Sequence, residues 1–150
     1  MPGSSVSFFL PFGTQIMVQA FCNASWQERA TITPSNGTPV VLSGSGFYDT
    51  PMGAFALTTA ASGPAPQGDP VTVTIEHSSD GGATWQPSQV DVGPCQIMYY
   101  NMYIVASEDS GDDTWDDATV YFTWTAMPPS APSKARTALA VPNMNPHDRA

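Results

Sequence analysis

The chain is a succession of short stretches in which apolar and polar residues alternate or aromatic and β-branched residues gather, with turn-forming residues between them. Alternation with a period of two puts successive side chains on opposite faces of an extended segment, so such stretches predict β-strands. Pro11-Phe12-Gly13-Thr14 separates the first two stretches and predicts a tight turn that joins them as a hairpin. The predicted strands are residues 6–10, 16–21, 71–75, 96–106 and 120–125.

The same pattern predicts the fold class. No window keeps a helical period over three turns, and Gly and Pro interrupt the chain at short intervals. These signals favour an all-β fold, a small antiparallel β-sandwich with Greek-key-like connections. From Ala126 the chain becomes proline-rich and then small, polar and basic. We therefore expect residues 1–125 to form one sandwich domain and residues 126–150 to form an extended or disordered tail.

Charge along the chain is strongly one-sided. Thirteen Asp and Glu residues face four Lys and Arg residues, a formal net charge of −9. Arg29 is the only Lys or Arg before Lys134, so the carboxylates before the tail have almost no cation to pair with. Nucleic acid is excluded as a partner, because binding phosphates needs Lys and Arg. A metal ion is the natural counter-charge for any cluster of these carboxylates.

Signals for targeting and redox state say little. No apolar run is long enough to cross a bilayer, so membrane insertion is not expected. The N-terminus lacks the basic segment of a secretory signal, which leaves a cytoplasmic protein, export without such a signal, or a signal removed beforehand. We interpret Cys22 and Cys95 as two buried thiols, and the alternative is a disulfide between them.

Residues 107–117, named the acidic loop here, are the most distinctive segment for function. They lie between two predicted strands and contain a glycine that allows a sharp bend. Calcium takes six to eight oxygen ligands and neutralises crowded carboxylates well, so the loop predicts a calcium site. The order of residues does not match an EF-hand. The carboxylates are Glu108, Asp109, Asp112, Asp113, Asp116 and Asp117.

Two other interpretations of the acidic loop remain open. The loop can be a solvated segment whose charge only aids solubility. A glycoside hydrolase with a carboxylate pair is the other, but such enzymes need two carboxyl groups at set distances in a deep cleft. A small domain with crowded acids fits that requirement poorly, so we expect a protein that is not an enzyme.

Ser78-Ser79-Asp80-Gly81-Gly82-Ala83-Thr84-Trp85 resembles the Asp box of sialidase-type propellers. The motif occurs once here, and a sialidase needs several arginines for its substrate. We therefore interpret it as a structural hairpin in which Asp80-Gly81 forms the turn and Trp85 packs beneath. His77 and His147 have no evident partners in the sequence and are interpreted as ordinary surface histidines.

Two segments together resemble the LecB-type calcium-dependent, fucose- and mannose-binding bacterial lectins. The first is Met102 to Trp124, which includes the acidic loop, and the second is Phe9 to Ser25, with Phe21-Cys22-Asn23-Ala24-Ser25 at its end. The similarity covers roughly residues 5–125 and is weak in the middle. It implies a small β-sandwich that holds a pair of calcium ions, to which sugar hydroxyls bind directly.

The resemblance also implies roles for individual residues. Thr114 replaces an Asp that bridges the two ions, and Trp26 replaces a small residue of the loop that tunes sugar preference. The chain continues to Ala150, so the terminal carboxylate that completes a partner's calcium site in the family is not expected. The implied metal ligands are Asn23, Glu108, Asp112, Thr114, Asp116 and Asp117. The implied sugar-binding residues are Ala24, Ser25, Trp26 and Asp109.

The sequence thus supports two hypotheses. The first is a lectin with calcium as its cofactor, which recognises a monosaccharide such as fucose or mannose, or a cell-surface glycan, and forms a homo-oligomer, either a dimer or a tetramer. The second is a lectin-like sandwich retained as a structural or protein-interaction module, with reduced or no calcium and sugar binding. Thr114 and the longer chain favour the second.

Overall fold

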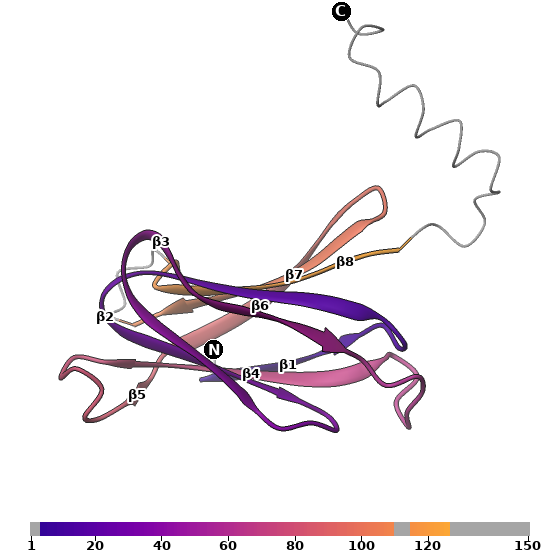
Figure 1. The fold of residues 1–150 in the computed structure, drawn as a ribbon, viewed down its shortest axis with the longest axis horizontal. Coiled ribbons are helices and arrows are strands. Elements are labelled where there is room, and N and C mark those ends of the chain that lie inside the picture. Colours follow the sequence, from indigo (N-terminus) through magenta and orange to yellow (C-terminus); the bar gives the residue numbers. More distant parts are fainter. Residues whose placement is uncertain (1–3, 110–114, 127–150) are drawn as a thin grey trace, which may run out of the picture.

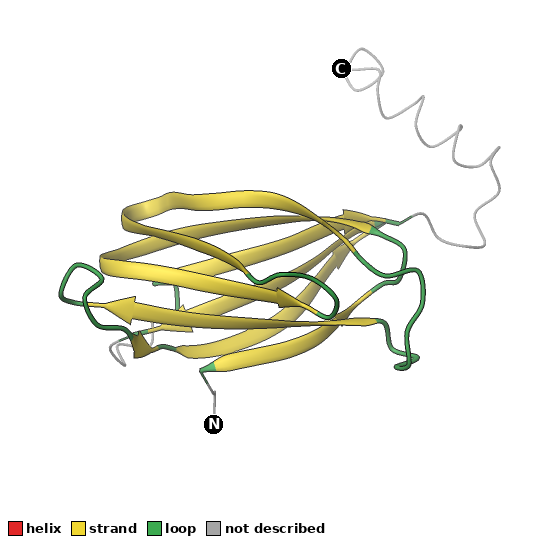
Figure 2. Ribbon diagram, turned by 60° about the horizontal axis from the view of Figure 1, so that its bottom comes forward, coloured by secondary structure: helices red, strands yellow, loops and turns green. Residues whose placement is uncertain are grey.

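Most of the predicted alternation becomes strand, and the strands form one antiparallel sheet that folds over into two layers (Figures 1 and 2). The structure is a computed structural model that describes residues 4–109 and 115–126. These residues contain no helix, and therefore none of the length and apolarity needed to cross a membrane. The strands are β1 (Ser5–Leu10), β2 (Gln15–Pro34), β3 (Val40–Thr58), β4 (Asp69–Ser78), β5 (Gln86–Pro87), β6 (Gln89–Ile97), β7 (Tyr100–Glu108) and β8 (Ala118–Thr125).

The long strand β2 belongs to both layers. Along the sheet the order is β1-β4-β2-β8-β7-β6, with β3 also paired to β2 and β5 to β4. Residues 17–22 of β2 pair with β8, and residues 27–34 pair with β4. The register against β3 shifts three times between Ala20 and Glu28, as expected where bulges bend a strand. Residues 23–26 lie in this bend, between the parts of β2 that pair with β8 and with β4.

Alternate side chains of the strands fill the space between the layers. Ile16, Val18 and Ala20 of β2 are all buried, as the period of two predicts. Across the layers, the ring of Phe8 in β1 meets that of Phe122 in β8 edge to face, with 5.1 Å between ring centroids. The predicted all-β fold is confirmed, and strands that are neighbours in the sheet are often distant in the sequence.

The predicted hairpin between the first two strands is wrong. Residues 11–14 do connect β1 to β2, but β1 pairs with β4 and makes no ladder with β2. The backbone N–H of Gly13 donates to the carbonyl of Ala60 at 2.8 Å, and that of Thr14 donates to the hydroxyl of Thr59, also at 2.8 Å. These bonds hold the turn on the segment that follows β3 while the chain passes to a different pairing partner.

The prediction of one strand over residues 96–106 is also wrong. Met98 and Tyr99 form a tight turn there, and the segment is divided between β6 and β7, which pair from Gln89↔Glu108 to Ile97↔Tyr100. Met98 adopts a φ of 55°, which a residue other than glycine seldom takes. No Gly, Asn, Asp or Pro marks the turn, so extended cross-strand pairing rather than turn chemistry determines where the chain reverses.

The two thiols occupy different environments. Cys22 is buried in β2 and Cys95 is exposed in β6, and both are free. Burial, and secondly the carboxyl of Glu28, raise the pKa of the Cys22 thiol. The expectation of buried thiols therefore holds for Cys22 and is wrong for Cys95, and the alternative disulfide does not form.

The Asp-box segment forms the turn expected of it. The carboxylate of Asp80 accepts hydrogen bonds from the hydroxyl of Ser78 at 2.6 Å and from the backbone N–H of Thr84 at 2.9 Å. These bonds and one from the Thr84 hydroxyl lower the pKa of Asp80 to about 2. Gly81 has a φ of 73°, and Trp85 packs under the turn with the Arg29 guanidinium 4.2 Å from its ring centre.

Gly68→Ala is expected to lower the free energy of unfolding by about 3 kcal/mol, since backbone strain and a steric clash act together. Gly68 has a φ of 138°, and an added Cβ would collide with the carbonyl oxygen of Leu10. The control is Gly81→Ala, because Gly81 also has a positive φ, 73°, but open space around it. The control should lose only about 1–2 kcal/mol. Urea unfolding of both variants tests this, and equal losses would contradict it.

Candidate functional site

The bend of β2 brings Asn23 to the base of the acidic loop, 93 positions away in the sequence. The side-chain amide of Asn23 donates to Oδ2 of Asp116 at 2.7 Å, and its backbone N–H donates to the carbonyl of Asp117 at 2.9 Å. Its side-chain oxygen accepts the backbone N–H of Tyr48 at 3.0 Å. These bonds juxtapose Asn23 with the loop, as the resemblance implies.

Backbone donors hold the carboxylates at both ends of the loop. The backbone N–H of Asp109 donates to Oδ2 of Asp117 at 2.8 Å, which ties the outgoing end of β7 to the incoming end of β8. Glu108 is buried, and its Oε2 accepts the backbone N–H of Trp115 at 3.4 Å. Asp112 and Thr114, two of the implied ligands, lie outside the described residues, as does Asp113.

Glu28 is a fully buried carboxyl group that faces Asp109. Within the described part of the chain, no N–H or O–H group of a neighbour reaches Oε1 or Oε2 of Glu28, or Oδ2 of Asp109. Burial, then the hydrogen bond to Asp109 and the charges of Asp109 and Asp117, raise the pKa of Glu28 to about 11. At neutral pH the Glu28 carboxyl is therefore protonated, and its single proton can be donated to the carboxylate of Asp109.

Asp109 is held on its other side by Ser88 and His77. The hydroxyl of Ser88 donates to Oδ1 of Asp109 at 2.6 Å, and Nδ1 of His77 lies 2.9 Å from that hydroxyl. Because the single Ser88 proton goes to Asp109, Nδ1 of His77 must carry a proton and donate to Ser88. Nδ1 also lies 3.3 Å from Oδ1 of Asp109, whose side chain is only 4% exposed.

The loop that follows Asn23 ends on an aromatic stack. Ala24 is buried and Ser25 is exposed, while the indole of Trp26 lies parallel to the His77 ring, with 5.3 Å between centroids and 17° between planes. The interpretation of His77 as an ordinary surface histidine is wrong, because its ring is covered by Trp26 and bonded on the inside. His147 lies outside the described residues.

Sequence reasoning missed three residues of the site, namely Glu28, His77 and Ser88. A signal for two of them was present. His77 continues the inward-facing series of Val73 and Ile75, as Glu28 does for its own strand neighbours. A titratable residue at an inward position of a strand is either paired or functional. Nothing in the sequence marks Ser88.

The donor atoms near the loop suit calcium. Asn23, Glu108, Asp116 and Asp117 present oxygen, which a hard cation such as calcium prefers to the nitrogen and sulfur that zinc takes. In the ranges 4–109 and 115–126, no three His, Cys, Asp or Glu side chains are arranged to hold a metal ion.

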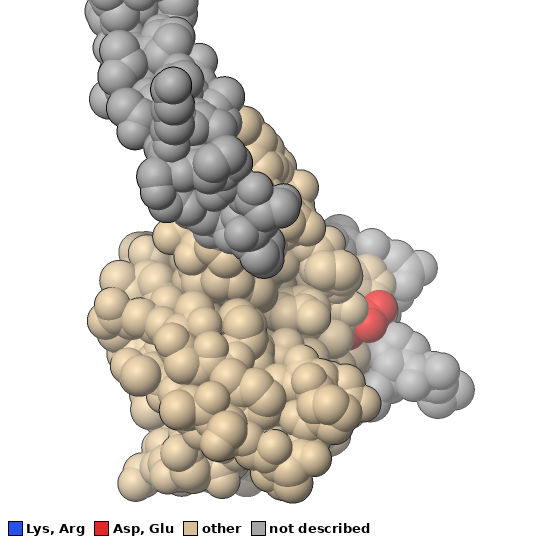
Figure 3. Space-filling model, turned by 90° about the vertical axis from the view of Figure 1, so that its right-hand side faces the viewer, with Lys and Arg blue, Asp and Glu red and all other residues tan. Residues whose placement is uncertain are grey.

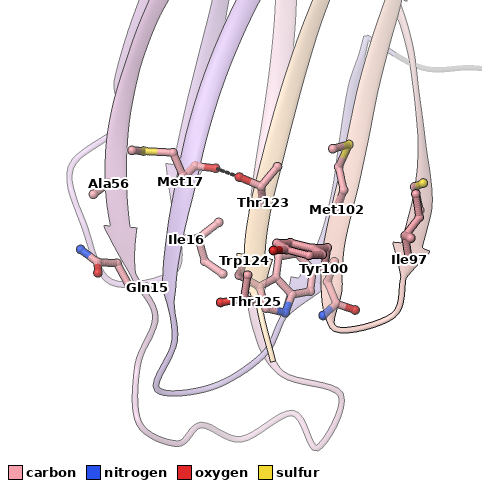
Figure 4. Close-up of a pocket in the computed structure, with 12 residues that line it drawn as sticks. Gln15, Ile16, Met17, Ala56, Ile97, Tyr100, Met102, Thr123, Trp124 and Thr125 are labelled. Atoms are coloured by element: carbon pink, nitrogen blue, oxygen red, sulfur yellow. Dashed lines mark hydrogen bonds between the residues drawn. The ribbon is translucent and has the colours of Figure 1, made fainter. Parts of the chain in front are cut away.

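A separate apolar cavity of about 530 Å³ lies at the opposite end of β7 (Figure 4). Met17, Ile97, Tyr100, Met102 and Trp124 contribute to its lining, and among the residues that the structure describes no Asp, Glu, Lys or Arg does. Tyr100 and Glu108 are at the two ends of β7, roughly 26 Å apart for an extended strand of this length. The cavity therefore belongs to a different surface from the carboxylate site.

The family profile of Fucose-binding lectin II (PA-IIL) matches residues 8–126, which include both ends of the site. The chain belongs to the fucose-binding lectin II family. Among curated proteins, no sequence matches this lectin. The match to this family profile confirms the LecB-type resemblance.

Solved bacterial lectins share the fold. A high-affinity mannose-binding lectin of Ralstonia solanacearum is 24% identical with a TM-score of 0.61, covering 80% of this chain and 96% of its own. The Chromobacterium violaceum lectin CV2L, solved with alpha-methyl-fucoside, is 20% identical with the same TM-score and coverage. The C-terminal domain of the BC2L-C lectin from Burkholderia cenocepacia is 21% identical with a TM-score of 0.60, covering 84% and 99%.

Family membership decides the class of function. Lectins bind carbohydrate without transforming it, so the expectation that this protein is not an enzyme is confirmed. The hydrolase interpretation of the acidic loop is set aside for the same reason. Carbohydrate is the class of partner, whereas the sugar, the ion and the assembly are matters for proposal.

Proposed function

We propose that this lectin binds a saccharide such as fucose or mannose through calcium held by the acidic loop and Asn23. The observation that carries this proposal is the hydrogen bond between Asn23 and Asp116, which joins the two implied halves of a metal site. Calcium, when bound, supplies strong directed contacts to neighbouring sugar hydroxyls. The protein supplies the oxygen ligands and holds them in place before the sugar arrives.

We assign the ligands and the sugar contacts as follows. Asn23 can accept from Tyr48 and still ligate an ion, because an amide oxygen has two lone pairs. Asp109 accepts from Ser88 and is nearly covered by its neighbours, and we assign it a hydrogen bond with the sugar because the resemblance implies that role. Thr114 offers one neutral oxygen instead of a charged bridge, which weakens any second ion. The proposed metal ligands are Asn23, Glu108, Asp112, Thr114, Asp116 and Asp117, and the proposed sugar contacts are Ala24, Ser25, Trp26 and Asp109.

We further propose that the apolar end of the molecule joins copies of this lectin into a homo-oligomer, a dimer or a tetramer. Ile97 and Tyr100 are exposed there beside the cavity, and no charged side chain of residues 4–109 or 115–126 lines it. On the face in Figure 3, the visible described residues show one small acidic area at the edge and no Lys or Arg. Because the body is otherwise acidic, two copies meet with least repulsion at this uncharged end. Several sites in one assembly would raise the affinity for a multivalent glycan.

Adding calcium to the chelator-treated protein is expected to raise its melting temperature by about 5 °C, and fucose or mannose is expected to bind only when calcium is present. Calcium at a hundred times its Kd stabilises the folded state by about 2.7 kcal/mol, which gives a shift of this size. Thermal melts and isothermal titration calorimetry measure the two effects.

A matched pair of variants locates the ion in this experiment. Asp116→Ala removes the partner of Asn23 and should abolish both responses, whereas Asp91→Ala changes an exposed carboxylate of β6 and should keep them. Absence of any calcium shift in the wild type would refute the proposal and favour a structural or protein-interaction module. A calcium shift without a response to either sugar would also favour that module.

A further inference from the structure

Trp26 and the carboxylate of Asp109 lie on two sides of His77. The proposed calcium site gives His77 no role, so its place between them needs another explanation. We propose that His77 is a positioning residue of the saccharide site: its ring holds Trp26 as a flat platform for the apolar face of the sugar, and its Nδ1, with Ser88, fixes the carboxylate of Asp109. This inference rests on the proposed function and adds the means by which two sugar contacts are held together.

On the buried side of the ring, Nδ1 of His77 helps to hold the carboxylate of Asp109, the proposed acceptor for a sugar hydroxyl. Nδ1 is within 2.9 Å of the Ser88 hydroxyl and 3.3 Å of Asp109, while Ser88 donates to the same Asp109 oxygen at 2.6 Å. The backbone N–H of Ser88 donates to the carbonyl of Ile75 at 3.0 Å, so the hydroxyl is itself anchored to β4. His77 thus orients the Ser88 hydroxyl, and that hydroxyl donates to Oδ1 of Asp109, which restricts the orientation of the carboxylate.

On the solvent side, the His77 ring supports Trp26, the proposed platform for the sugar. Trp26 covers His77 with one face of its indole, yet 39% of the residue remains exposed. An aromatic face attracts the weakly positive C–H groups of a sugar and shields them from water. Trp26 follows Asn23 by three residues, which places their Cα atoms within about 11 Å of each other. The indole is therefore close in the chain to Asn23, the residue to which we assign the ion.

The Asp-box turn gives His77 a rigid support. Ser78, the next residue, accepts the backbone N–H of Gly82 at 2.8 Å through its hydroxyl, and Asp80 bonds Thr84 across the turn. The strand end that carries His77 is thus held on both sides, by the sheet and by the turn. From the sequence, the Asp box was interpreted only as a structural hairpin. In the structure it also matters for the site, because it helps to fix the position of the His77 ring.

Two substitutions separate the two functions of His77. His77→Phe keeps a ring for Trp26 but has no donor for Ser88 and Asp109. His77→Asn places an amide N–H close to the former Nδ1 position but has no ring. We expect each to weaken the binding of methyl α-fucoside or methyl α-mannoside by about 10-fold, and His77→Ala by about 100-fold, since each lost contact corresponds to about one hydrogen bond or one stacking contact.

Further readouts show which contact each variant has lost. Acrylamide quenching of the indole, with Trp26→Phe as the reference for the other three tryptophans, should rise in His77→Asn and stay unchanged in His77→Phe. Ser88→Ala should reproduce the sugar-binding loss of His77→Phe without altering the quenching. Calcium affinity, followed by thermal melts, should remain within about twofold of the wild type in all variants, which also shows that they fold.

The possible results distinguish the inference from the function on which it rests. Folded His77→Phe and His77→Asn variants that bind sugar as tightly as the wild type would overturn the positioning role alone. Equal quenching in these two variants would overturn the platform and leave the function intact. A wild type that binds calcium but neither sugar would overturn both.

Discussion

Glu28→Gln is expected to stabilise the calcium-free protein by about 3 kcal/mol at pH 7. Glu28 is fully buried, and its pKa is raised to about 11, with desolvation as the largest cause. In the unfolded chain the carboxyl ionises near its model value of 4.5, so folding at neutral pH must take up a proton. Glutamine needs no proton, and its amide can donate to Asp109 as the protonated carboxyl does.

The pH dependence of this effect follows from the direction of the shift. Because the folded pKa lies above the unfolded one, the contribution of Glu28 is complete below about pH 4.5 and is lost as the pH rises toward the folded pKa. The stability difference between Glu28→Gln and the wild type should therefore grow by about 1.4 kcal/mol per pH unit from pH 5 to pH 8. The other titrating groups are the same in both proteins, so their effects on the free energy of unfolding cancel in this difference.

Urea unfolding in the presence of chelator, repeated across this pH range, measures the difference. Glu76→Gln is the matched control, because Glu76 pairs with Arg29 at 2.9 Å in a partly exposed position and should change stability by less than about 1 kcal/mol. Glu28→Ala should be less stable than Glu28→Gln at every pH, since it removes the hydrogen-bond donor to Asp109 and leaves a cavity. A difference for Glu28→Gln that is flat with pH would rule out a protonated Glu28.

Ile97→Asp is expected to convert the oligomer to monomers at micromolar concentration. Ile97 lies beside the uncharged cavity and is 67% exposed, so the substitution should cost the isolated chain little. In an assembly formed through this end, each copy would bury a new carboxylate beside another acidic chain. Burying an unpaired charge at an interface costs several kcal/mol, which corresponds to at least 100-fold weaker association.

Light scattering coupled to size-exclusion chromatography measures the assembly state. Val41→Asp is the control, because Val41 in β3 is 56% exposed and lies outside the cavity lining. It should leave the oligomer unchanged, and both variants should melt within a few degrees of the wild type. An oligomer that persists in Ile97→Asp, or a monomeric wild type at high concentration, would show that this end is not the interface.

The strands and part of the site were predictable because they depend on local pattern. A period of two specifies which side chains point inward, so the cores of β2 and β4 follow from their sequences. The acidic loop is evident from its crowded carboxylates, and the resemblance to a lectin family linked it to Asn23. Residues 22–34 of β2 and the whole of β3 were not among the predicted strands. The two wrong predictions, the hairpin at residues 11–14 and the undivided segment 96–106, concern how strands pair. Pairing depends on residues distant in the sequence, which no local pattern contains.

The sequence by itself determined an all-β chain with an acidic loop and few cations to balance it. Only the tertiary structure decided that Glu28, His77 and Ser88 surround Asp109. Each lies on a different strand or connection, and their meeting depends on the bend in β2 and on the register of β4 against it. Burial, and secondly the carboxylates that the fold places beside it, raise the pKa of Glu28. Neither the burial nor these neighbours can be derived from the sequence around Glu28, because both depend on the tertiary structure.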